Sequence, residues 1–286
     1  AALAMTLKTI EFAKERQAIP FAVFKPTGLG RLDLYEKVGS KAILTTSEQA
    51  EWDRVVDRFD LVCKTAHYKD VALLIDAEES WMQDAADDLV AQMMQKYNKE
   101  KAIVFNTLQM YRWDRLDYLK QLHERAKQEG FYIGMKLVRG AYMEKENARA
   151  EEKGYPTPIC PSKEATDVNY DAAVLYMLDH IDSMAIFAGT HNELSSYTLM
   201  NLMQERGIKN NDERIWFGQL YGMSDNISYN LAANRYNVAK YLPFGPVKDV
   251  MPYLIRRAEE NTSVAGQTSR ELSMIKAERT RRKSLQ

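Results

Sequence analysis

Polar side chains directly follow seven short apolar runs in this 286-residue sequence. They are Lys25; Asp76 and Glu78; Asn106 and Gln109; Lys136, Arg139 and Tyr142; Thr190, His191 and Asn192; Gln219; and Lys240 and Tyr241. Lysine and arginine bind carboxylates and phosphates, whereas carboxylates and amides orient such cations or bind hydroxyl groups. One polar residue after a strand is usually a loop residue or a helix cap. Seven such places in one chain favour a shared binding site.

A second candidate for ligand binding lies between Tyr241 and Asn261. The apolar residues of this segment recur at helical spacing, and Tyr253, Arg256, Arg257 and Glu260 fall on the opposite side of the predicted helix. Two adjacent guanidinium groups can hold a carboxylate through bidentate hydrogen bonds, with a glutamate restraining them. The plainer interpretation of the same pattern is a solvated, salt-bridged helix face.

The apolar runs that precede these residues predict strands. They lie at 21–25, 71–76, 102–106, 131–138, 184–190, 214–220 and 237–242. Continuous apolar runs of this length are typical of parallel sheets covered on both faces, and amphipathic helical patterns separate them. Thr46 followed by Gln49 predicts a capping box at the start of the helix after residue 45. Such alternation indicates an α/β protein.

Two α/β architectures fit this alternation: an open doubly wound sheet and a closed (β/α)8 barrel. The Gly28-Leu29-Gly30 segment lacks the third glycine of a dinucleotide fingerprint. The evenly spread strands, and a length near the ~250 residues of a typical barrel, favour the TIM-type barrel. The sequence offers seven strands, although a closed barrel has eight. No linker or repeat divides the chain, so we expect one barrel domain at 1–265 and a helical, basic tail at 266–286.

Composition argues against several functional classes. The chain carries 39 Lys and Arg against 40 Asp and Glu, which argues against a global affinity for nucleic acid. Two cysteines cannot form a disulfide framework, so a reducing compartment is expected. No apolar run approaches the ~20 residues of a spanning helix, and the first residues lack a signal-peptide pattern. Nothing spaces His67, His123 and His180 as metal ligands, so no metal site is expected.

Four blocks of the sequence together resemble the flavin-dependent proline dehydrogenases. The blocks are IDAEES (75–80), KLVRGAYM (136–143), GTHN (189–192) and YLPFGP…YLIRRAEEN (241–261), in the family's order across nearly the whole chain. The resemblance implies a distorted (β/α)8 barrel whose first strand is missing from this chain. The seven predicted strands would be the second to eighth of the family, and residues 1–17 would form the helix after the absent strand.

The resemblance assigns six residues to the substrate and the catalytic chemistry: Lys25, Asp76, Leu220, Tyr241, Arg256 and Arg257. The two arginines and Lys25 are implied to bind the carboxylate of proline. Tyr241 is implied to pack on the proline ring away from the flavin, and Leu220 to line the pocket. Asp76 is implied to hold Tyr241 or Lys25 in place by hydrogen bonding.

Eleven further residues are implied to bind FAD: Asn106, Gln109, Lys136, Arg139, Gly140, Ala141, Tyr142, Thr190, His191, Asn192 and Glu260. Lys136 is implied to lie near flavin N5, where positive charge stabilises the reduced flavin. Residues 139–142 are implied to run along the flavin and its phosphates, and residues 190–192 to contact its ribityl, pyrophosphate or adenine parts. The two amide side chains would face the ring system, and Glu260 would hold a ribose hydroxyl.

The implied activity is FAD-dependent oxidation of L-proline to Δ1-pyrroline-5-carboxylate by hydride transfer to flavin N5, the first step of proline catabolism. Electrons would then pass to a quinone. Such chemistry needs orientation and electrostatic support and no protein nucleophile. The expected location is the cytoplasm or the inner membrane periphery in a bacterium, and the mitochondrial matrix or inner membrane in a eukaryote. The tail RTRRK (279–283) is a thin indication of peripheral membrane contact.

Three other interpretations remain open at the level of sequence. A Schiff-base aldolase on the same barrel would use Lys25 or Lys136 to form an imine with its substrate. A catalytically inactive barrel would act as a binding protein. A hydroxyproline-preferring member of the flavin family is the third, but the bulk of Tyr241 would crowd a ring hydroxyl, so proline is the expected substrate.

Overall fold

Seven parallel-type strands make up the sheet of the protein, in the order β1-β2-β3-β4-β5-β6-β7. They are β1 (Phe21–Phe24), β2 (Ala72–Ile75), β3 (Val104–Gln109), β4 (Ile133–Val138), β5 (Met184–Gly189), β6 (Ile215–Leu220) and β7 (Val238–Tyr241). Each neighbouring pair from β1 to β6 is parallel, with Phe24 opposite Ile75 in the first pair and Gly189 opposite Gly218 in the last. Each of the seven predicted runs therefore overlaps a strand, and the predicted α/β class is confirmed.

The computed structural model describes residues 2–243 and, beyond them, 247, 248, 250, 251, 254, 255, 276, 279, 280 and 283. The predicted site residues Arg256, Arg257 and Glu260, and most of the predicted tail, lie outside the described residues. The chain divides into two compact units. The first is Ala1–Gly218 with Asn226–Ala239, and the second is Gln219–Asp225 with Lys240–Gln286. The predicted boundary at residue 265 stays a prediction.

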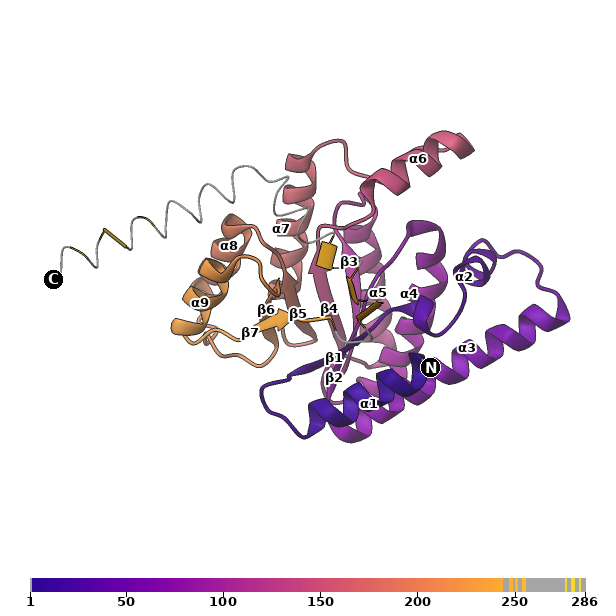
Figure 1. The fold of residues 1–286 in the computed structure, drawn as a ribbon, viewed down its shortest axis with the longest axis horizontal. Helices are drawn as coiled ribbons and strands as arrows, with labels where there is room; N and C mark the ends of the chain where they lie inside the picture. Colours follow the sequence, from indigo (N-terminus) through magenta and orange to yellow (C-terminus); the bar gives the residue numbers. More distant parts are fainter. Residues whose placement is uncertain are drawn as a thin grey trace. The chain divides into compact units, whose positions relative to one another are not determined.

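Helices follow the strands along the chain. They are α1 (Ala2–Lys14), α2 (Leu32–Gly39), α3 (Thr46–Lys69), α4 (Ser80–Tyr97), α5 (Arg115–Glu129), α6 (Met143–Lys153), α7 (Lys163–Asp179), α8 (Glu193–Glu205) and α9 (Asp225–Ala233), with a short 3-10 turn, η1, at Pro26–Gly28. The helix expected at residues 1–17 is α1, which packs along α3 (Figure 1). Within the described parts of the chain, no helix has the length and apolarity needed to cross a membrane.

The start of α3 corrects one sequence prediction. The capping box is formed by Thr45 and Glu48, not by Thr46 and Gln49. The Thr45 hydroxyl accepts the Glu48 N–H at 3.3 Å, and the Glu48 carboxylate accepts the Thr45 N–H at 2.9 Å. Thr46 already has helical geometry, so its side chain cannot act as the N-cap.

The boundary of β3 also differs from the prediction. The strand runs to Gln109 rather than ending at Asn106, because its polar residues find partners within the fold. The Thr107 hydroxyl donates to the carbonyl of Ile75 on β2 at 2.7 Å. A polar residue whose hydrogen bond is satisfied can continue a buried strand, although its type suggests a strand end.

The inner face of the sheet carries a separate apolar core that shows how strongly the sheet is curved. The ring of Phe21 on β1 packs edge-on against Phe105 on β3, Phe187 on β5 and Trp216 on β6, with centroids 5.8, 5.1 and 5.1 Å away. In a flat sheet β1 and β6 would lie about 24 Å apart, five strand spacings of ~4.8 Å. The contact between Phe21 and Trp216 therefore requires the curl of a barrel.

Glycine makes room for these rings. A Cβ on Gly218 would lie 2.1 Å from Phe187, and one on Gly134 would lie 2.6 Å from Phe105. Large side chains on one strand thus pack over bare backbone on the next, which fills the narrow interior of the barrel. A second, larger core lies between the strands and the surrounding helices, and includes Ile186 and Phe217.

Candidate active site

Three charged side chains meet at the carboxyl ends of β1, β2 and β4. Lys136 Nζ donates to Asp76 Oδ1 at 2.7 Å, and Lys25 Nζ lies 3.6 Å from Asp76 Oδ2. Asp76 and Lys136 are each 8% exposed, whereas the side chain of Lys25 is 47% exposed. One buried carboxylate therefore bridges two ammonium groups, of which only Lys25 reaches solvent.

The surroundings of Lys25 keep it charged. Burial alone would lower the pKa of the Lys25 ammonium, but the nearby Asp76, Tyr142 and Glu78 raise it above its ordinary value. Burial also raises the pKa of the Tyr142 phenol, against the opposing effect of Lys25. At neutral pH the site therefore presents a lysine cation and a neutral phenol.

A second buried carboxylate, Glu78, stands beside this cluster. Its two oxygens accept the backbone N–H of Thr27 at 2.9 Å and the Thr27 hydroxyl at 2.8 Å. Burial raises the pKa of the Glu78 carboxyl, against the opposing effects of Lys25 and Thr27. The ends of β1, β2 and β4 thus bring together two carboxylates and two ammonium groups: Lys25, Asp76, Glu78 and Lys136, which we call the strand-end cluster.

The structure separates the two amides that were expected to face one ring system. The side chain of Asn106 donates to Asp87 on α4 at 2.8 Å, so it lies between the sheet and the helices. Gln109 Nε2 lies 3.5 Å from the carbonyl of Ala77, in the loop after β2. Gln109 Oε1 is buried and accepts no hydrogen bond from the described residues. A buried acceptor of this kind is suited to an N–H donor of a ligand.

Arg139 is the centre of a second polar group at the ends of β4 and β5. Its guanidinium donates to Asp167 at 2.6 Å, to the Thr190 hydroxyl at 2.8 Å and to the Ser195 hydroxyl at 2.9 Å. It also stacks over the ring of Tyr170, with its central carbon 4.5 Å from the centroid. The cation is thereby fixed at the start of α8, and a helix N-terminus with an arginine beside it attracts anions.

The residues around Arg139 are held by backbone geometry. Asn192 is the N-cap of α8 and accepts the N–H of Ser195 at 3.2 Å, and His191 is half-buried beside it. Gly140 has a φ of +132°, and a Cβ there would lie 2.5 Å from the ring of Tyr111. Only glycine fits at this position. Ala141 follows it, and Tyr142 is the N-cap residue of α6.

Two predicted residues lie in the second compact unit, Leu220 at the end of β6 and Tyr241 at the end of β7. The carbonyl of Tyr241 accepts the N–H of Tyr221 at 2.9 Å. Lys240, also in this unit, pairs with Asp225 at 2.7 Å and donates to the carbonyl of Met223 at 2.7 Å. These contacts show how the ends of β6 and β7 are joined.

Sequence reasoning missed several residues that support the site. Asp167 and Ser195 fix Arg139, and Thr27 fixes the turn after Lys25, yet none of them directly ends a strand. Glu146 of α6, which is fully buried, accepts the Ser80 N–H at 2.6 Å and the Ser80 hydroxyl at 2.5 Å. The only available signal was spacing: a carboxylate four residues after the N-cap of α6, too common a pattern to identify a partner 66 residues away.

The fold and the site together define a parallel α/β barrel with a cluster of paired charges at the carboxyl ends of its strands, where barrel enzymes carry their active sites. A sequence profile of the proline dehydrogenase family matches residues 2–270. The chain therefore belongs to the proline dehydrogenase family of oxidoreductases, which is flavin-dependent in general. Within the part of the chain that the structure describes, no cluster of three or more potential metal ligands occurs.

Of two similar proteins of known name, one carries the name of this family and the other a different name. The chain is 41% identical over 241 residues to "Proline dehydrogenase 1, mitochondrial" of Homo sapiens, across 83% of this chain and 40% of that protein. It is 36% identical over 281 residues to "Carbapenem antibiotics biosynthesis protein CarD" of Pectobacterium carotovorum subsp. carotovorum, across 98% of this chain and 72% of that protein.

Solved structures support the fold. Proline utilization A (PutA) from Bdellovibrio bacteriovorus superimposes with a TM-score of 0.79 at 22% identity, over 92% of this chain and 28% of that protein. The predicted TIM-type barrel class is thereby confirmed. The chain spans less than half the length of the human and PutA proteins.

Proposed function

We propose that this protein is an FAD-dependent proline dehydrogenase that oxidises L-proline to Δ1-pyrroline-5-carboxylate. The observation that carries the proposal is the strand-end cluster, in which Asp76 bridges a buried and a half-exposed lysine at 2.7 and 3.6 Å. A substrate with both a carboxylate and an amine needs a fixed cation to orient it, and Lys25 is such a cation. Family membership supplies the reaction class.

On the substrate side, Lys25 binds the proline carboxylate together with Arg256 and Arg257. Two guanidinium groups and one ammonium group would together hold the carboxylate in one orientation and select for an anionic substrate. Asp76 holds Lys25 in place through its ion pair. Leu220 and Tyr241 supply the apolar and aromatic walls for the ring.

On the cofactor side, the residues present fit a flavin. The buried acceptor Gln109 Oε1 suits an imide N–H of the ring, and Lys136 supplies a buried positive charge. Arg139 and the N-terminus of α8 suit the pyrophosphate. FAD, when bound, accepts a hydride at its N5 atom. The residues proposed to hold it are Asn106, Gln109, Lys136, Arg139, Gly140, Ala141, Tyr142, Thr190, His191, Asn192 and Glu260, with Asn106 placed to act only through its neighbours.

The protonation state of Lys25 argues against the aldolase. An imine-forming lysine must lose its proton, which requires a lowered pKa. The pKa of Lys25 is instead raised, and Lys136 donates to a carboxylate 2.7 Å away. Both lysines are better suited to binding anions than to attacking a carbonyl carbon.

Proline is the proposed substrate in preference to 4-hydroxyproline, because Tyr241 would crowd a ring hydroxyl. The substitution Tyr241→Ser should raise the ratio of kcat/KM for 4-hydroxyproline to that for proline by about tenfold, the effect of removing one steric clash of this size. Steady-state kinetics with both substrates measure this ratio. Comparable kcat/KM values for the two substrates in the unaltered protein would contradict the proposal.

The further steps of the proposal concern electron transfer and location. A quinone is the proposed acceptor of the electrons. Peripheral contact with a membrane is proposed as the route to that quinone, at the inner membrane of a bacterium or of a mitochondrion, with the cytoplasm or matrix as the adjoining compartment.

The visible spectrum of the purified protein tests the central proposal. A flavin spectrum that bleaches on anaerobic addition of L-proline is the expected result. Trapping of a substrate on a lysine by borohydride, with no flavin spectrum, would establish the aldolase instead. Absence of both reactions in protein supplied with FAD would indicate a binding protein.

A further inference from the structure

The buried carboxylate of Glu78 anchors the turn that follows Lys25. Lys25 directly follows β1 and precedes the 3-10 turn η1, which is closed by a hydrogen bond from the Gly28 N–H to the Lys25 carbonyl at 2.9 Å. Both oxygens of Glu78 bind Thr27 within this turn, at 2.9 and 2.8 Å. Glu78 is 6% exposed and follows β2, so its carboxylate ties the loop after β2 to the loop after β1.

The backbone of Glu78 is hydrogen-bonded to a chain of buried polar side chains. Its N–H donates to Gln83 Oε1 at 2.9 Å, and Gln83 Nε2 donates to Asp87 Oδ1 at 2.8 Å. Asp87 in turn pairs with Arg115 at 2.8 Å, and both side chains are at most 6% exposed. A continuous set of hydrogen bonds therefore runs from α5 through α4 to the turn that carries Lys25.

A carboxylate is a costly anchor for this turn. Burying a charged group loses its hydration, and a neutral amide could accept one of the same hydrogen bonds from Thr27. A carboxylate adds negative charge, and Glu78 is one of the groups that attract the Lys25 ammonium. Asp76 alone faces both lysines, so the buried Glu78 supplies the second negative charge beside the two ammonium groups.

We propose that Glu78 is a positioning residue for the substrate carboxylate. Through Thr27 it fixes the turn that carries Lys25, and its charge holds the Lys25 ammonium at the strand ends. This inference rests on the proposed function, in which Lys25 binds the carboxylate of proline. Glu78 does not touch the substrate, so it acts only through Lys25.

A double-mutant cycle with the FAD-loaded protein tests the inference. Glu78→Gln keeps the size of the side chain and removes its charge, and Lys25→Met removes the ammonium. We expect Glu78→Gln to raise KM for L-proline about tenfold, the loss of about one charge-assisted hydrogen bond, with kcat changed less than about threefold. In the Lys25→Met background, Glu78→Gln should change KM less than about twofold.

A second readout does not depend on turnover. Tetrahydrofuran-2-carboxylate, the oxygen analogue of proline, has no amine to oxidise, and its Kd can be measured from the change in flavin absorbance. This Kd should rise about tenfold in Glu78→Gln and show the same dependence on Lys25. Thr27→Val, which keeps the backbone N–H and loses the hydroxyl, should have a smaller effect in the same direction.

The matched control is Glu129→Gln. Glu129 is a carboxylate on α5 that pairs only with Arg125 among the ion pairs of the described residues, so its replacement should leave KM and Kd unchanged.

An equal rise of KM in both backgrounds would overturn the inference, because Glu78 would then act independently of Lys25. So would an unchanged KM with a lowered Tm. If the unaltered protein shows no flavin reduction by L-proline, the proposed function itself is wrong. If it does, and Lys25→Met leaves KM unchanged, only the role of Lys25 and this inference are wrong.

Discussion

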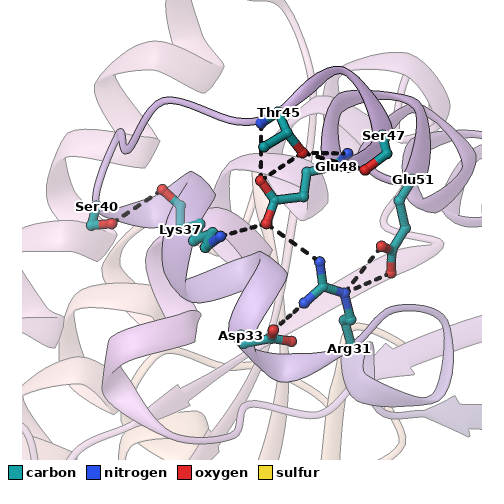
Figure 2. A network of polar contacts seen from close by, with 8 residues as sticks. All are labelled: Arg31, Asp33, Lys37, Ser40, Thr45, Ser47, Glu48 and Glu51. Atoms are coloured by element: carbon teal, nitrogen blue, oxygen red, sulfur yellow. Dashed lines mark hydrogen bonds and ion pairs between the residues drawn. The ribbon is translucent and has the colours of Figure 1, made fainter.

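Two charged networks border the same stretch of chain, and they differ in their exposure to water. The strand-end cluster includes Lys25, and a second network follows a few residues later in the chain. This surface network lies around the start of α3 and consists of Arg31, Asp33, Lys37, Glu48 and Glu51 (Figure 2). Arg31, Asp33 and Lys37 have side chains 40%, 60% and 44% exposed, whereas Asp76 and Lys136 have side chains 10% exposed.

The difference in exposure indicates a difference in purpose. In the surface network, Figure 2 shows Glu48 completing the capping box with Thr45 while it receives Lys37 and lies near Arg31. These contacts join α2 to the start of α3. Because the partners Arg31, Asp33 and Lys37 are exposed, water could replace any one contact at little cost in folding free energy.

In the strand-end cluster, Asp76, Glu78 and Lys136 are buried, where a charge needs its partner, and Lys25 alone reaches solvent. Such an arrangement is retained where a ligand needs a fixed charge.

Of the substitutions that compare the two networks, replacement of Asp76 should have the largest effect on the free energy of unfolding. In Asp76→Ala the Lys136 ammonium loses the carboxylate 2.7 Å away while it stays buried. Removal of one partner of a buried ion pair costs about 3–5 kcal/mol of unfolding free energy. Urea denaturation of the variant measures this loss. The exposed Asp57 on α3 offers the control, since Asp57→Ala should change the unfolding free energy by at most about 0.5 kcal/mol.

A loss below about 1 kcal/mol in Asp76→Ala would place the strand-end cluster in the same class as exposed surface pairs. The double variant Asp76→Ala, Lys136→Met sharpens the result. It removes the buried charge along with its partner, so it should recover part of the stability lost in the single variant.

Continuous apolar runs were enough to predict the seven strands, because most residues of the strands β2 to β6 are buried, whichever face of the sheet they are on. The strand ends then indicated Lys25, Asp76 and Lys136 as site residues. The exact limits were harder to predict, since Thr107 continues β3 only because the carbonyl of Ile75 accepts its hydroxyl. That partner lies 32 residues away and is brought close by sheet register.

Long-range pairing accounts for the rest of what sequence could not show. The bond between Asp76 and Lys136 joins residues 60 apart, and the bond between Thr27 and Glu78 joins residues 51 apart. Neither spacing has a local signal. The resemblance to the flavin family suggested Tyr241 or Lys25 as partners of Asp76. Lys25 lies 3.6 Å from Asp76, and Lys136, which was not expected there, binds the same carboxylate at 2.7 Å.

The second prediction uses the pH dependence of stability to compare the two networks. Burial raises the pKa of Glu78, so the folded state binds its proton more readily than the unfolded state. Charged Glu78 therefore lowers stability at neutral pH, and protonation restores it as pH falls through its raised pKa. Glu78→Gln should be more stable than the unaltered protein at pH 7, and the difference should shrink toward pH 4. Urea denaturation across this range measures it, and a difference independent of pH would contradict the assignment.

Glu48 in the surface network should show the opposite sign. Hydrogen bonds from Lys37 and from Thr45 lower the pKa of Glu48 to about 2. Its charged form therefore stabilises the fold above its unfolded pKa of about 4.3, and this contribution is lost as pH falls toward 2. Glu48→Gln should be less stable than the unaltered protein at pH 6 and equal to it near pH 2. Denaturation curves at the two pH values test this, and a gap that persists at pH 2 would show that shape, not charge, is responsible.

The smallest effect is expected at the exposed edge of the surface network. Arg31 Nε lies 3.0 Å from both oxygens of Glu51, yet both side chains reach water. Glu51→Gln should lower Tm by no more than about 2 °C. The shift should vanish in 1 M NaCl, where the Debye length is about 3 Å, whereas the loss in Asp76→Ala should be nearly independent of salt because water and ions do not reach that pair. Thermal melts of both variants at low and high salt measure the contrast. Equal salt dependence in the two would mean that burial does not distinguish the networks.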